Sequence, residues 1–169
     1  MSEHPLKSIS EAAVESALEK AVWYRALNEP LEAESICRDV LELQASNQKA
    51  IATLLLALSD QFPRGLRARF REAKALASRL ESDYEREYFT GLITERRAKC
   101  QHHKGTPGCG HLAYEGLRAA MTHYEKAEKL SQPDNDDAVL RWNTCVRIIE
   151  ANANITPEPS AARHPVELE

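Results

Sequence analysis

The feature that most limits the fold of this chain is the three- and four-residue spacing of its apolar side chains. Such spacing places side chains along one face of a helix, and it recurs through most of the sequence. No stretch keeps the two-residue alternation of a strand, and helix-favouring residues such as Ala, Leu, Glu and Arg are abundant. The 169 residues therefore predict an all-α protein with a single core.

Turn-forming residues divide this pattern into predicted helices arranged as short antiparallel pairs. The clearest breaks fall at Asn28–Pro30, Pro63–Gly65 and Pro133–Asn135. The predicted helices cover about residues 11–27, 30–44, 48–62, 66–81, 83–99, 112–131 and 136–151.

We predict one helical domain over residues 9–151, interrupted by an insertion loop at about 100–111. Residues 1–8 form a predicted N-terminal tail. Residues 152–169 are rich in proline and lack periodicity, so we predict a disordered C-terminal tail there.

A small residue followed by others four and seven positions later recurs three times along the chain. The instances are Ala33–Cys37–Val40, Ala73–Ala77–Leu80 and Ala120–Tyr124–Ala127. These spacings keep each triplet on one helical face. A small first residue lets a neighbouring helix approach closely, so the triplets predict contacts between stacked helix pairs.

Two segments that contain these triplets resemble the tetratricopeptide repeat (TPR) family. Residues 24–50 carry the aromatic Tyr24, the small Ala33 and an LEL sequence at 41–43. Residues 119–138 carry a second set of matching positions, namely Ala120, Tyr124, Ala127, Leu130 and Pro133. The unit around Ala73 is degenerate.

The resemblance has two departures. Ala45 stands where the family usually has a turn proline, and the alanine intervals are irregular. From Ala33 to Ala73 is 40 residues and from Ala73 to Ala120 is 47, against the family's 34. The excess falls at the Pro63–Gly65 break and at the predicted insertion loop.

The resemblance implies a right-handed helix-turn-helix solenoid of about three pairs with a capping helix. A non-repetitive bundle, which could oligomerise, is the alternative. In the capping helix the apolar side chains would face the stack, and three charged ones would face water. The apolar set is Val139, Trp142, Cys145, Val146 and Ile149, and the charged set is Arg141, Arg147 and Glu150.

The resemblance also implies that the first helix of each pair lines a concave groove that binds a peptide or partner segment. Arginine forks suit carboxylates, so the groove predicts an acidic or C-terminal segment as ligand. A solvated basic face is the alternative. The candidate groove residues are Arg25, Lys49, Leu56, Arg86, Phe89, Arg96 and Arg97.

The charge is uneven along the chain. Residues 64–104 hold 11 basic and 6 acidic side chains, whereas the flanks are acidic and the whole chain has a formal charge of −4. Within the basic run at 64–79 the one aromatic residue is Phe70, which is little for stacking nucleobases. We therefore expect a protein partner rather than nucleic acid.

The stretch CQHHKGTPGCGH at 100–111 combines thiols and imidazoles, which zinc prefers. Its spacing fits no standard zinc finger, so a metal-binding protein is an alternative function and no cofactor is otherwise expected. A flexible insertion and a Cys100–Cys109 disulfide remain open as well. The candidate metal ligands are Cys100, His102, Cys109 and His111, with His103 beside them.

Enzyme motifs are missing from the sequence. There is no phosphate-binding glycine loop, no H-E-x-x-H and no G-x-S-x-G, so we expect no enzyme. The N-terminus shows no apolar leader, and no apolar run reaches the length of a membrane span. We expect a cytoplasmic protein, without membrane contact, whose cysteines are reduced.

Overall fold

The computed structural model of the protein describes residues 4–158. In this range the structure contains seven α-helices, a short 3-10 helix at Glu11–Ala13 and no strand, so the all-α prediction is confirmed. The α-helices are α1 Val14–Ala26, α2 Pro30–Leu43, α3 Gln48–Asp60, α4 Phe62–Ala77, α5 Asp83–His103, α6 Cys109–Glu128 and α7 Asp137–Ala151.

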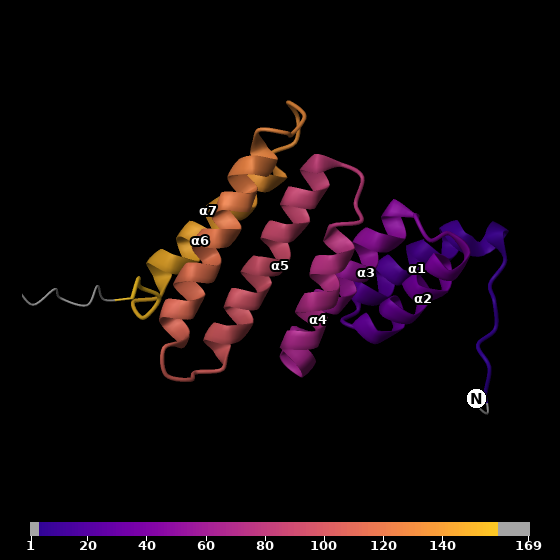
Figure 1. The fold of residues 1–169 in the computed structure, drawn as a ribbon, viewed down its shortest axis with the longest axis horizontal. Coiled ribbons are helices and arrows are strands. Elements are labelled where there is room, and N and C mark those ends of the chain that lie inside the picture. The colour runs from indigo at the N-terminus through magenta and orange to yellow at the C-terminus, as the bar shows by residue number, and fades with distance from the viewer. Residues whose placement is uncertain (1–3, 159–169) are drawn as a thin grey trace, which may run out of the picture.

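The helices follow one another across the molecule in chain order. Each helix packs against the next, and α1, α3, α5 and α7 also contact one another in turn. Figure 1 shows this progression, from α1 and α2 at one end to α6 and α7 at the other, with α5 between the two groups. We call the side formed by α1, α3, α5 and α7 the odd-helix face.

The first helices of successive pairs begin at nearly equal intervals. From Val14 to Gln48 is 34 residues and from Gln48 to Asp83 is 35, whereas from Asp83 to Asp137 is 54. The third pair is longer because α5 and α6 have 21 and 20 residues. The predicted break at Pro63–Gly65 is a kink within α4, where Gly65 has non-helical backbone angles, and the chain turns between α3 and α4 at Gln61. The alanine intervals of 40 and 47 therefore differ from the intervals between helix starts.

Small residues lie at the contacts between helices. Ala33, Ala73 and Ala120 are all fully buried, as the triplets predict. Two glycines, for which no packing role was predicted from the sequence, allow a still closer approach of α5 and α6. A Cβ on Gly91 would lie 2.8 Å from the Tyr124 ring, and a Cβ on Gly116 would lie 2.7 Å from that of Ala98.

The predicted insertion loop at 100–111 is wrong in extent. Residues 100–103 continue α5, residues 109–111 begin α6, and the turn between them is only 104–108. Gly105 and Gly108 adopt positive φ angles of 63° and 77°, which side-chain-bearing residues rarely adopt. Gly105 follows the C-cap Lys104 of α5 and Gly108 precedes α6, so the two glycines complete the turn without a longer loop.

The prediction of a disordered tail over 152–169 is also wrong for residues 152–158. Ile155 is only 3% exposed and packs in the core around α6 and α7. The backbone here crosses Gly110, where a Cβ would lie 1.9 Å from the Asn154 carbonyl oxygen. The imidazole of His111 bonds the Thr156 carbonyl through Nδ1 at 2.8 Å. Residues 159–169 lie outside the described residues.

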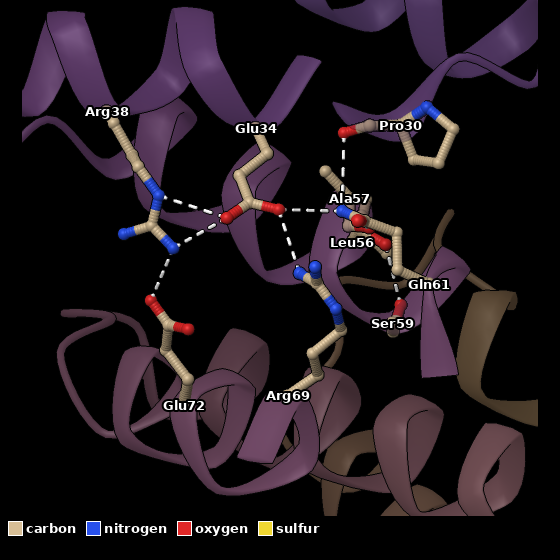
Figure 2. Close-up of polar contacts among 9 residues, drawn as sticks. All are labelled: Pro30, Glu34, Arg38, Leu56, Ala57, Ser59, Gln61, Arg69 and Glu72. Carbon is tan, nitrogen blue, oxygen red and sulfur yellow. Dashed lines mark hydrogen bonds and ion pairs between the residues drawn. The ribbon is translucent and has the colours of Figure 1, made fainter. Parts of the chain in front are cut away.

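An ion-pair network links α2 to α4 on the side opposite the odd-helix face. The Glu34 carboxylate, 15% exposed, accepts from Arg38 at 2.7 Å, Gln61 at 2.7 Å and Arg69 at 2.9 Å. Arg38 also pairs with Glu72 at 2.7 Å. Figure 2 shows Glu34 at the centre of this network, reached by side chains from α2, the α3–α4 junction and α4.

We predict that Gly116→Val lowers the free energy of unfolding by about 1–3 kcal/mol, because the new methyl groups would overlap Ala98. Urea unfolding followed by circular dichroism measures the change. The control is Glu115→Val at the exposed neighbouring position, expected within about 0.5 kcal/mol of wild type. Equal effects of the two substitutions would show that α5 and α6 are not in close contact at Gly116.

We predict that Glu34 contributes a pH-dependent part of the stability. Burial raises its pKa, but Arg38, Gln61 and Arg69 together bring the pKa below its ordinary value of 4.5. A carboxylate with a lowered folded pKa stabilises the protein above its unfolded pKa, and this contribution is lost as pH falls through the folded value.

The measurement compares wild type with Glu34→Gln by urea unfolding between neutral pH and pH 3. The difference in unfolding free energy should be constant near neutral pH and shrink below about pH 4.5. The exposed Glu42→Gln serves as control. A wild-type to Glu34→Gln difference that stays constant down to pH 3 would contradict the prediction.

Candidate functional site

Asp60 at the end of α3 joins three helices on the odd-helix face. Its carboxylate accepts from Arg25 Nε of α1 at 2.8 Å and from Arg96 Nη1 of α5. Arg96 Nη1 also donates to the Ser59 hydroxyl, and more weakly to the Leu56 carbonyl at 3.4 Å. The structure therefore brings two predicted groove residues, Arg25 and Arg96, to one carboxylate, and the carbonyl of a third, Leu56, accepts from Arg96.

Arg96 is partly buried and its guanidinium is paired with Asp60. Burial is the main cause that lowers the pKa of this guanidinium, and the neighbouring charges of Arg25 and Arg141 lower it further, while Asp60 acts in the opposite direction. The net direction is downward.

A pocket of about 500 Å³ opens beside this cluster, between the α3–α4 junction and the second half of α5. Four basic or imidazole side chains contribute to its wall, and Asp60 is the only acidic residue there. Its lining residues are Ser59, Asp60, Pro63, Arg96, Lys99, Cys100, His103 and Lys104.

Glu95 lies one residue before Arg96 and is fully buried between α5, α6 and α7. Its carboxylate accepts from the Tyr124 hydroxyl at 2.7 Å and pairs with Lys99 at 2.9 Å and Arg141 at 2.8 Å. Burial raises the pKa of Tyr124, so the phenol stays protonated and donates.

Arg141 therefore faces inward, and the prediction that it faces water is wrong. Burial lowers the pKa of its guanidinium, but Glu95 and Tyr124 more than offset this and raise it overall. Buried carboxylates attract such partners because an unpaired buried charge is costly. Neither Glu95 nor Arg141 was identified from the sequence, since an acidic residue four positions before Lys99 looks like any solvated helix pair.

The remaining predicted groove residues lie elsewhere. Lys49 is exposed at the start of α3, beside α1. Arg86 bonds the Leu80 and Glu81 carbonyls and Asp83 at the start of α5, so it stabilises the α4–α5 turn.

Phe89 and Arg97 both lie on α5 but contact different neighbours. Phe89 packs edge-on against Tyr88, with ring centroids 5.3 Å apart, at the margin of the core. Arg97 projects toward α4, where its guanidinium lies 4.5 Å from the centroid of the Phe70 ring.

The predicted metal ligands do not assemble. Among residues 4–158, no group of three His, Cys, Asp or Glu side chains is arranged to hold a metal ion. Cys100 and His102 lie on α5 while Cys109 and His111 lie on α6, and His111 is bonded to a carbonyl. The zinc hypothesis therefore gains no support from the geometry.

All four cysteines are free thiols. Burial raises the pKa of Cys37 and of Cys145 to about 12, so these two thiols are unreactive small apolar side chains, as the helical pattern predicts. Cys100 and Cys109 are half-buried and unpaired, and Cys100 lies in the wall of the 500 Å³ pocket.

Comparisons with known proteins identify no relative. No family model, no curated protein and no solved structure matches this chain. In the part of the chain that the structure describes, none of the helices combines the length and apolarity needed to cross a bilayer.

We predict that Glu95→Gln lowers the free energy of unfolding by about 3–5 kcal/mol, because Lys99 and Arg141 lose their buried counter-charge. Urea unfolding followed by circular dichroism measures this loss. Glu115→Gln, at an exposed position of α6, should change stability by less than about 0.5 kcal/mol. A loss below about 1 kcal/mol for Glu95→Gln would mean that the carboxylate does not hold these cations.

Proposed function

We propose that this protein is a TPR-like interaction module that binds an acidic segment of a partner protein on its odd-helix face, at the pocket beside Asp60. The pairs would form a short right-handed solenoid with α7 as the capping helix. The partner segment would lie across α3 and α5, where Arg96 and Lys99 meet the pocket.

Regular spacing supports the TPR-like interpretation. The intervals of 34 and 35 residues between the starts of α1, α3 and α5 agree with the family's repeat of 34. Side-chain contacts repeat the same interval: Arg25 bonds Asp60 across 35 residues, Asp60 bonds Arg96 across 36, and Arg38 bonds Glu72 across 34. Equivalent positions of successive pairs thus lie side by side.

The observation that carries the proposed ligand is the charge balance on this face. Two carboxylates hold the ion pairs beside the pocket, Asp60 with Arg25 and Arg96 and Glu95 with Lys99 and Arg141. The pocket itself is lined by the cations Arg96, Lys99 and Lys104, and Asp60 is the one carboxylate in its wall, so cations outnumber carboxylates there. Guanidinium groups can bind a further carboxylate with two parallel hydrogen bonds, which favours an acidic peptide.

Isothermal titration with an Asp/Glu-rich peptide and its Asn/Gln counterpart tests the proposal. We expect the acidic peptide to bind at least about tenfold more tightly, because the amide version cannot neutralise the surplus charge. Arg96→Gln, which keeps a donor for Asp60, should weaken binding by about tenfold.

Arg147→Gln is the matched control, since Arg147 is exposed on α7 and has no ion-pair partner within the described residues. It should leave the affinity unchanged. Equal affinities for the acidic and amide peptides would remove the electrostatic part of the proposal. Loss of binding in both arginine variants alike would assign it to overall charge instead of to this pocket.

A further inference from the structure

A second pocket, of about 660 Å³, lies between α4 and the second half of α5, and its wall on α4 is formed by residues between Gly65 and Arg71. We call it the α4–α5 groove. Arg67, Arg71, Arg97 and Lys104 contribute its charged groups, and no acidic residue lines it. Lys104 is the one lining residue that it shares with the 500 Å³ pocket, so the two sites lie side by side along α5.

The cations of the α4–α5 groove differ from those of the odd-helix face in having no counter-charge. In the described part of the chain, Arg67, Arg71, Arg97 and Lys104 form no ion pair. By contrast, Arg69 on the same helix pairs with Glu34 at 2.9 Å. Four unneutralised cations around one hollow create a strong local positive potential.

The cations form two rows that match the spacing of a helix. Arg67 and Arg71 are four residues apart on α4, which separates them by about 6 Å along the axis. Arg97 on α5 and Lys104, which directly follows α5 with helical backbone angles, are seven residues apart, or about 10 Å. Glutamates four and seven residues apart on an incoming helix would have the same spacings, so a helix can satisfy both rows.

Apolar side chains lie between the rows. Leu66, Ala68 and Phe70 of α4 line the groove; Leu66 is partly buried and Ala68 exposed, while the Phe70 ring is covered on one side by Arg97. An amphipathic helix binds such a groove by laying its apolar face on the floor and its charged edges on the rims. The groove is therefore complementary to a helix that carries leucine-like side chains flanked by carboxylates.

The aromatic ring in the groove is already occupied. The Arg97 guanidinium covers Phe70 at 4.5 Å, and Phe62 packs edge-on against the same ring with centroids 6.0 Å apart. A nucleobase would need a free ring face on which to stack. Cation–π stacking also holds the Arg97 fork in place, which reduces the entropy lost when it binds a carboxylate.

We propose that the α4–α5 groove is a second docking site, which binds an acidic amphipathic helix of a partner protein. It is distinct from the site of the proposed function, because Arg67 and Arg71 lie on α4 and Arg97 projects toward α4, and Lys104 is the one residue that lines both pockets. The occupant is defined by two features, carboxylates at helical spacing and apolar residues between them.

The test uses a fluorescent, capped helical peptide with glutamates at four-residue spacing and leucines on one face, measured by anisotropy at low ionic strength. A twin peptide with glutamine for every glutamate, and a single-stranded RNA of matched charge, are the comparison probes. Saturable binding of the acidic helix is expected, with the glutamine twin at least about tenfold weaker.

The double variant Arg67→Glu/Arg71→Glu should lower the affinity for the acidic helix by about tenfold or more. It removes no ion pair among the described residues, so folding should persist, which circular dichroism checks. Lys126→Glu/Lys129→Glu, at the end of α6 and directly after it, makes the same change of charge at exposed positions outside the α4–α5 groove, and should leave binding unchanged.

The Arg96→Gln variant separates this proposal from the proposed function. Binding of the acidic helix should survive Arg96→Gln and fail in the Arg67→Glu/Arg71→Glu variant. The reverse pattern would place the helix at the Asp60 pocket and overturn the groove. Absence of saturable binding, equal binding of the glutamine twin, or tighter binding of the RNA would also overturn it.

Discussion

Helix pairs in this chain can stack only where small side chains occupy the contacts between them. Ala33, Ala73 and Ala120 are completely buried, and Gly91 and Gly116 leave no space for a side chain between α5 and α6. Close-packed interiors do not tolerate extra volume, so these positions fix how far each helix can slide along its neighbour. The starts of α1, α3 and α5 are 34 and 35 residues apart, and residues separated by about this interval, such as Arg25 and Asp60, come into contact.

This alignment explains where the long polar side chains meet. The contacts of Arg25 with Asp60 and of Arg38 with Glu72 span 35 and 34 residues and connect helices that are not neighbours in sequence. The two sides of the molecule differ in their charge balance. On the α2–α4 side, Glu34 and Glu72 meet Arg38 and Arg69, two carboxylates with two cations.

In the ion pairs of the odd-helix face, the numbers of carboxylates and cations are not equal. There two carboxylates meet four cations, and one of the carboxylates, Glu95, is completely buried. The α2–α4 network is therefore balanced in charge, while the ion pairs of the odd-helix face hold more cations than carboxylates. The same contrast explains why we place the proposed ligand on that face and not beside Glu34.

The number of helices and most of their bounds could be predicted from the sequence, because periodicity, Asn47 as N-cap and the glycine and proline turns are local signals. The ends of α5 and α6 could not. Histidine and cysteine are compatible with a helix, and the positive φ angles of Gly105 and Gly108 made a five-residue turn sufficient. The tail beyond α7 was mispredicted because one apolar residue, Ile155, docks on α6 without any periodic pattern.

The candidate sites were predictable only in part, for a geometric reason. Side chains of adjacent helix residues point about 100° apart, so Arg96 and Arg97 lie on different surfaces, although the sequence predicted both in one groove. Arg96 turns to Asp60 of α3 and Arg97 to Phe70 of α4. A change of both arginines together would alter two pockets at once, whereas single changes on α4 or at Arg96 assign a binding effect to one surface.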